Sequence, residues 1–261
     1  LQLTSSQSAH STGVLKMSTG DSIVSDGTHS QISVGAAAGS EGGNMLFSSG
    51  AAVNGVGGSI RLKGGNTQTS LGGSVTVISG ESVSSGGSGG NVEVYTNHAN
   101  GGSSGIVSVS SGASEAEQTG NVILNTGLSN TASSGSIRVK SGAASSQQSG
   151  SVSLNGGAGQ TTGGSVHVVS GSSTTLSSGK VQIQTGESSS AGSGEVTMQS
   201  GSTTEEQSGT TTISSGASST SSSGDIQLVV SEGQSEGGSV HVSAGFSNVM
   251  TGGSVNTVTG S

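Results

Sequence analysis

Gly135-Ser136-Ile137-Arg138-Val139-Lys140-Ser141-Gly142 is the stretch that decides the fold, because nearly the same eight residues return along the whole chain. The shared pattern is Gly, polar, branched apolar, any residue, branched apolar, any residue, Ser or Thr, and Gly. The alternation of Ile137 and Val139 with Arg138 and Lys140 has the period of a half-buried β-strand. The two glycines mark turns. The unit therefore predicts a short strand with one apolar face and one polar face.

The unit recurs at a nearly fixed spacing from Gly13 to Gly253, with one slip at the unit that begins at Ser30. The first and last starts lie 240 residues apart over 16 intervals, so the 17 units have a mean period of 15 residues. A single unit cannot bury its apolar face, whereas stacked units bury a continuous ladder. We therefore expect an all-β fold, a single-chain flattened β-solenoid (β-helix) of about 17 rungs with 15 residues per rung.

The predicted core ladder consists of the third and fifth residues of each unit, which are almost all branched and apolar. Its central members are Ile60, Leu62, Val75, Val77, Val92, Val94, Val107, Val109, Val122, Leu124, Ile137, Val139, Val152, Leu154, Val166, Val168, Val181 and Ile183.

The segments between the predicted strands are mostly Ser, Thr, Gly and Ala. Two residues into each of them the side chain is small, and we expect these side chains to face inward, opposite the ladder. Examples are Ser22, Thr67, Ser82, Ser114, Ser129, Ala144, Ser188, Thr203 and Ser218.

The domain organisation follows from the phase of the repeat. Residues 13–261 are expected to form one elongated array, and residues 1–12, with Leu1 and Leu3 in the alternating spacing, to be part of a preceding rung. We expect the array to be a piece of a longer one, or to stack end to end with other copies, because solenoid ends expose unpaired strand edges.

Composition limits the possible functions. With 50 Gly, 27% hydrophobic residues and 1% aromatic residues, composition alone would indicate a disordered chain, and only the period favours order. A net charge of -8 with six Lys and Arg argues against nucleic acid and anionic membrane as partners. No apolar run is long enough for membrane insertion. The absence of Cys removes disulfides and thiolate chemistry.

No constellation of catalytic residues emerges from the sequence. The acidic residues fall mostly in the turns, where solvation is the simplest role. The five His lie in different rungs, and His167 and His241 would be about 24 Å apart at ~4.8 Å per rung. We therefore expect no catalytic residues, no metal site and no cofactor, and we expect that the protein is not an enzyme.

Units such as Gly150-Ser151-Val152-Ser153-Leu154 and Gly164-Ser165-Val166-His167-Val168 resemble the Ser/Gly-rich β-solenoid repeats of secreted and cell-surface filaments and adhesins in algae, other protists and bacteria. The resemblance covers the chain from Gly13 onward and concerns repeat style. It implies an extracellular or cell-surface structural protein, a rigid stalk or filament subunit. Its partners would be copies of itself or adjacent filament proteins, with O-glycans as a further candidate on the Ser and Thr of the turns.

Two alternative functions remain open from the sequence. The period is similar to that of insect antifreeze β-helices, which bind ice through Thr-x-Thr arrays. Here only Thr210-Thr211-Thr212 repeats Thr at the outward positions. Ice binding is therefore the first alternative, and a carbohydrate-binding adhesin is the second.

Overall fold

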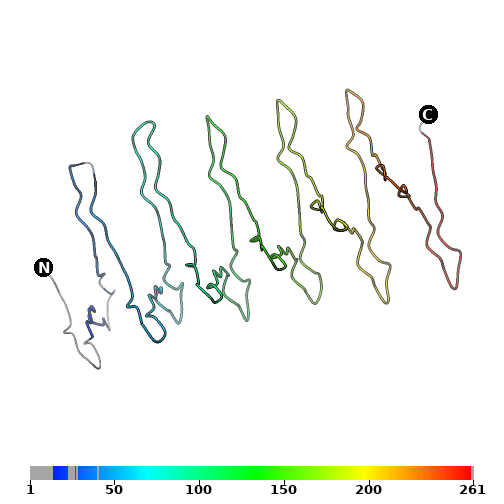
Figure 1. Cartoon of the computed structure of the whole chain (residues 1–261). Coiled ribbons are helices and arrows are strands. Elements are labelled where there is room, and N and C mark those ends of the chain that lie inside the picture. The colour runs from blue at the N-terminus through cyan, green and yellow to red at the C-terminus, as the bar shows by residue number, and fades with distance from the viewer. Residues whose placement is uncertain (1–13, 23–26, 28, 40, 260–261) are drawn as a thin grey trace. The chain divides into compact units, whose positions relative to one another are not determined.

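The computed structural model describes residues 14–22, 27, 29–39 and 41–259, and within these ranges it contains no helix and no strand. The chain instead consists of extended runs joined by loops (Figure 1). The expected all-β fold, a flattened β-solenoid or β-helix, is therefore wrong. The partial rung predicted for residues 1–12 lies outside the described residues.

The 15-residue repeat still governs where the chain turns. In the middle of the chain the backbone bends at residues 100–102, 115–117, 130–132 and 145–147, one bend per repeat. Every bend falls in the Ser- and Gly-rich segment between two apolar pairs. We number each unit from its first residue, usually Gly, so that the apolar pair occupies positions three and five and a second Gly usually occupies position eight. The loop then extends from position eight to position one of the next unit.

The two ends of a loop meet at a point that we call the neck. The Gly58 N–H donates to the Gly50 carbonyl over 2.8 Å, and the Gly73 N–H donates to the Gly65 carbonyl over 2.9 Å. Each bond joins position one of a unit to position eight of the unit before it. The same bond closes the loops Gly80 to Gly90, Gly157 to Gly164, Gly171 to Gly179 and Gly245 to Gly253.

Small residues make the necks narrow. The Ser49 hydroxyl, at position seven, donates to the Gly58 carbonyl over 3.0 Å and ties the same two ends together. Where position seven is Gly64, the backbone approaches so closely that a Cβ there would overlap the Gly73 carbonyl. A Cβ on Gly73 would lie 2.9 Å from the Gly65 nitrogen. A larger residue at such a neck would push the two ends of the loop apart.

Inside most loops a hydroxyl caps a tight turn. The Ser114 hydroxyl accepts the Glu117 N–H over 3.1 Å, and the Ser129 hydroxyl accepts the Ala132 N–H over 3.2 Å. This is the local bond by which Ser and Thr favour turns. The same bond, from a hydroxyl to the N–H three residues on, recurs at Thr67, Ser173, Ser188, Thr203, Ser218 and Ser247.

The inward placement expected for the small residues of the loops is therefore wrong at these positions. Thr67, Ser129 and Ser188 are small and hydroxylic because they bind the backbone of their own loop, with no ladder opposite them. A hydroxyl bound locally needs no partner from another repeat.

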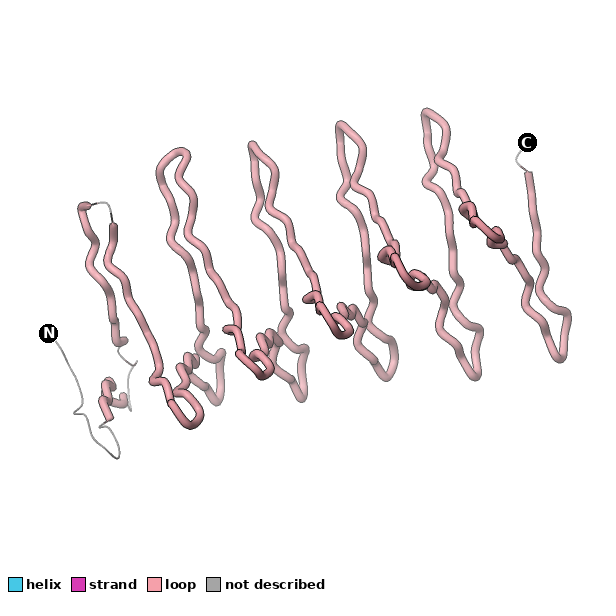
Figure 2. The backbone as a smooth tube through the Cα atoms, viewed as in Figure 1, coloured by secondary structure: helices cyan, strands magenta, loops and turns pink. Residues whose placement is uncertain are grey.

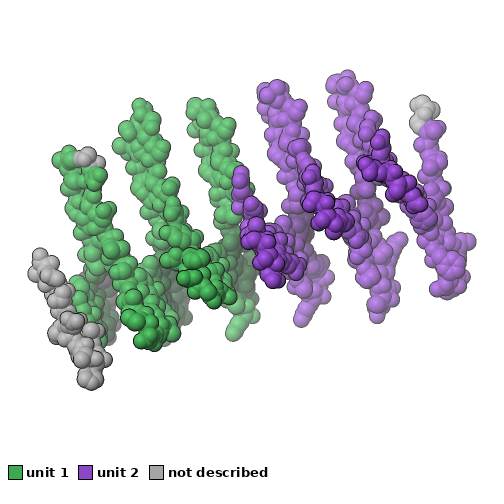
Figure 3. Space-filling view, in the orientation of Figure 1, with its two compact units in different colours: residues 1–137 green, residues 138–261 purple. Residues whose placement is uncertain are grey.

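The chain divides into two units, residues Leu1–Ile137 and Arg138–Ser261, which Figure 3 shows in separate colours. Within each unit, long extended runs are joined by narrow loops (Figure 2).

The exposed apolar residues show why the solenoid prediction fails. A solenoid needs each run to pair with the run of the next repeat, so that equivalent apolar residues stack. In the part of the chain that the structure describes, the backbone hydrogen bonds close the necks or lie inside a loop, and none joins two runs. Equivalent apolar residues of successive repeats therefore stay exposed and form no core.

Candidate functional site

The predicted core ladder forms an exposed apolar surface in this structure. Its 18 central members range from 49% exposed at Ile137 to 77% exposed at Val109. Among the described residues no hydrophobic side chain is buried. Because positions three and five are two residues apart on an extended run, both side chains point to the same side of it. We call these two residues, repeated in every unit, the apolar pair.

The least exposed of the described residues lie beside the necks and in the loops. Ser79, Ser141 and Ser170, all at position seven beside a neck, are half-buried. Ser129 and Ser247, which cap turns, are half-buried as well. The least exposed side chains are therefore small ones beside the necks and in the loops, whereas the apolar residues of the repeat are exposed.

The accessible surface is very large for the mass of the chain. It amounts to 26405 Å² for 24.6 kDa. A folded monomer of that mass exposes about 10,000 Å², and a fully unfolded chain about 36,000 Å². The single chain thus leaves in water most of the surface that a globular protein would bury. Since much of this surface is apolar, its contact with water opposes the isolated state.

The backbone of the runs is also left without partners. In the part of the chain that the structure describes, seven backbone hydrogen bonds occur outside regular elements. Six of them close necks, and the seventh, from the Gly87 N–H to the Ser84 carbonyl, lies inside a loop. None of them involves positions two to seven of a run. Each fully described run therefore presents N–H and C=O groups along both of its edges that no backbone hydrogen bond of the chain uses.

The other side of the runs is mostly polar, with scattered apolar residues such as Ile123, and carries few charges. Arg61 and Lys63 lie at positions four and six of one unit, and Arg138 and Lys140 at the same positions of another. All four are exposed. The acidic residues gather mainly in the loops. There Glu117 and Glu206 use their backbone N–H in capped turns while their side chains remain exposed.

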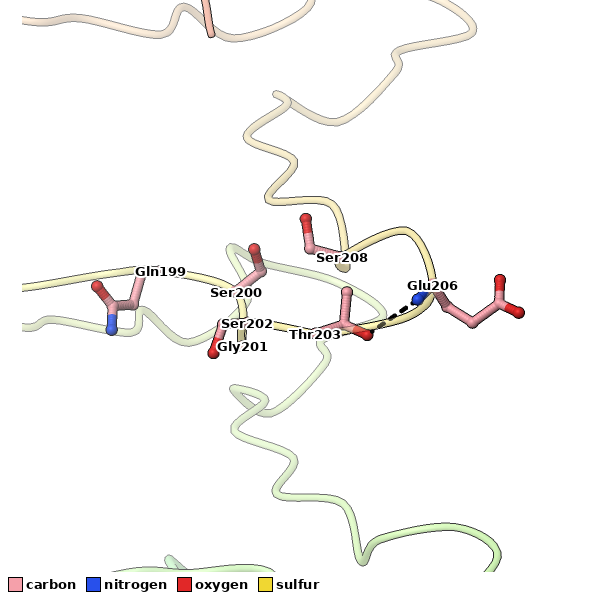
Figure 4. A pocket seen from close by; sticks show the side chains of 7 residues that line it. All are labelled: Gln199, Ser200, Gly201, Ser202, Thr203, Glu206 and Ser208. Atoms are coloured by element: carbon pink, nitrogen blue, oxygen red, sulfur yellow. Dashed lines mark hydrogen bonds between the residues drawn. The ribbon is translucent and has the colours of Figure 1, made fainter. Parts of the chain in front are cut away.

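One loop encloses a shallow polar hollow, shown in Figure 4. It belongs to the second unit and is lined by Gln199, Ser200, Gly201, Ser202, Thr203, Glu206 and Ser208. The Thr203 hydroxyl accepts the Glu206 N–H over 3.3 Å, and the Glu206 carboxylate points away from the hollow. The hollow is the inside of a capped turn. Its lining brings together no nucleophile, base and orienting group.

The His, Asp and Glu side chains are scattered along the described part of the chain. No group of three or more of them lies close enough there to hold a metal ion. Within the same residues, no helix has the length and apolar character needed to cross a bilayer.

The necks are the structural feature that sequence analysis missed. Their signal is present in the sequence as the recurrence of Gly at positions eight and one, with Ser, Thr or Gly at position seven. That spacing by itself indicates two separate turns that flank a strand. The structure joins them, as in the Gly171 carbonyl that accepts the Gly179 N–H over 2.9 Å.

Comparison of the chain with models of protein families, with curated proteins and with solved structures finds no match.

Proposed function

We propose that this chain is a structural protein of the extracellular space or cell surface that acts through self-association. The observation that carries the proposal is the repeated, exposed apolar pair. Val75 is 54% exposed and Val77 67% exposed, and closely similar values recur along the ladder, as for Val152 at 52% and Leu154 at 74%. An exposed apolar pair that recurs in repeat after repeat favours a role in interaction, because large exposed apolar surfaces are typical of interaction sites.

The repeat suits an assembling protein in a second way. Nearly every unit presents an apolar pair at the same two positions, so a partner that fits one unit also fits the next. Each added contact is intramolecular once the first has formed, which raises the overall affinity without a strong single contact. Burial of one pair contributes roughly 3 to 5 kcal/mol, so a few pairs suffice to hold two copies together.

The extracellular or cell-surface location rests on composition and on repeat style. A chain rich in Ser, Thr and Gly, without Cys, resembles the repeats of secreted filaments and surface layers. The net charge of -8 is carried largely by loop carboxylates and keeps loosely associated copies soluble.

The test compares two kinds of substitution on one run. Val122→Ser with Leu124→Ser removes an apolar pair, whereas Ile123→Ser removes an equally exposed apolar side chain, 76% exposed, from the opposite side of the same run. Sedimentation velocity over a concentration series, with electron microscopy of the sedimenting material, measures assembly. We expect the wild type to assemble, and the pair variant to need a concentration at least about tenfold higher.

Ile123→Ser should assemble like the wild type, because its side chain lies outside the apolar surface. A wild-type chain that stays monomeric at every concentration overturns the proposal. So does an equal loss of assembly in both variants, since that would assign no special role to the apolar pairs.

A further inference from the structure

The runs carry a second unused surface besides their apolar pairs, namely their backbone edges. In the described residues, position one donates and position eight accepts in the necks, while positions two to seven take part in no backbone hydrogen bond. An extended segment with free N–H and C=O groups is a template for pairing with another extended segment. Here the template repeats with every unit.

A second copy of the same chain matches this template in length and spacing. Its runs have the same six free positions, and its loops place them at the same 15-residue interval. When one run of each copy has paired, the next runs of the two copies lie close to each other. The next pairing is then favoured, and the total affinity rises with the number of paired runs. The register would be fixed in steps of whole units, because a shift of one residue would turn the apolar pair to the wrong side.

The exposed surface of the chain is large enough to form an interface with a second copy. The chain exposes 26405 Å², which exceeds by about 16,000 Å² what a folded monomer of its mass exposes. A stable protein interface needs about 1,600 Å² in total. Two copies paired along several runs pass this threshold while covering only part of the excess.

We propose that a second copy of this chain pairs edge to edge with the extended runs of the first and exchanges backbone hydrogen bonds with them. The result is an intermolecular β-sheet that neither copy contains alone. This inference rests on the proposed self-association and names its mode. Between the necks, positions two to seven of the described runs exchange no backbone hydrogen bond with another run of the same chain, so the pairing partner comes from another copy. The apolar pairs of the paired runs then lie side by side on one face of the sheet and stabilise it.

The test separates the backbone edge from the side chains. Thr76 and Ser108 occupy outward position four of two runs and lie outside the apolar pairs. Thr76→Pro with Ser108→Pro removes one N–H donor from each run. Thr76→Ala with Ser108→Ala shortens the same side chains but keeps both donors, and it serves as the matched control. Sedimentation velocity measures assembly, and the amide I infrared band measures sheet content at the same concentrations.

We expect the wild type and the alanine variant to show a β-sheet band that grows with the assembled fraction. The proline variant should need a concentration at least about tenfold higher for the same assembled fraction. Assembly without a sheet band, or equal assembly of the proline and alanine variants, overturns the edge pairing but leaves self-association standing. A full sheet band in the monomer also overturns it, because the pairing would then lie within one chain. A wild type that never assembles overturns the proposed function itself.

Discussion

The neck between Gly64 and Gly73 allows the sharpest test of the local structure. A Cβ on Gly64 would overlap the Gly73 carbonyl, whereas a Cβ on the adjacent Gly65 would meet no atom within 4 Å. Gly64→Ala therefore forces the two ends of the loop apart, and Gly65→Ala leaves them in place. The two variants add the same methyl group one residue apart.

The magnitude follows from the bond that the displacement breaks. The Gly73 N–H donates to the Gly65 carbonyl over 2.9 Å, and this bond closes the loop. A net hydrogen-bond contribution of about 0.5 to 1.5 kcal/mol corresponds to roughly a two- to tenfold change in the population of the closed neck. Amide hydrogen exchange of Gly73, followed by NMR, measures that population directly.

We expect the Gly73 amide to exchange roughly two- to tenfold faster in Gly64→Ala than in the wild type. Gly65→Ala should match the wild type within error, apart from the intrinsic effect of the neighbouring methyl group. Equal exchange rates in the two variants would refute the close approach at this neck.

Other positions give further expected outcomes. Ser129→Ala removes the hydroxyl that accepts the Ala132 N–H over 3.2 Å, so that amide should exchange faster. Ala144→Ser supplies a hydroxyl at the equivalent position of the next loop and should slow hydrogen exchange of the Gln147 amide. The expected change in exchange rate is roughly two- to tenfold for both substitutions. Gly86 has a φ of 89°, and a methyl group added there would meet no atom within 4 Å. Gly86→Ala should therefore destabilise its turn by about 1 to 2 kcal/mol through backbone strain alone. Gly102→Ala, also in open space but without positive φ, should not destabilise its turn, and amide hydrogen exchange within the two loops compares the variants. Ice crystals grown with the purified chain should remain unshaped, because the outward columns carry no regular Thr array, and strong faceting would instead favour ice binding.

The 15-residue period could be predicted from the sequence. In the structure the backbone bends once per repeat, as it does at residues 145–147 in the repeat from Gly135 to Ser149. The apolar positions could be identified as well, because alternation at Val75 and Val77 is independent of what covers them. The sequence does not show which residues pack against this apolar pair. The same alternation fits a chain whose repeats stack on one another and a chain whose apolar residues stay exposed for contact with another molecule. Periodicity reports which side chains share a face, but it does not report the direction of the next run.

The direction of the next run depends on the conformation of the loop. The loop sequence fits two different roles for its small residues, so it does not determine that conformation. Ser129 could face inward as a small packing residue or cap its own turn, and both roles require a short side chain. The bond to the Ala132 N–H decides for the second role. A Ser or Thr three residues before an exposed N–H is the signal that favours a capped turn, and it is present in the sequence.

The closed necks also give the chain a mechanical property. When the chain is pulled at both ends, a single hydrogen bond at each neck, such as the 2.9 Å bond between Gly245 and Gly253, prevents the residues of that loop from being extended. Breaking it releases roughly 20 to 25 Å of slack, given about 3.3 to 3.6 Å per extended residue. Because the necks follow one another in series along the covalent chain, a pulling force would open them one at a time, each at low force. Stretched fibres of this chain would therefore lengthen in many small steps, each of which dissipates energy, before the backbone is fully extended.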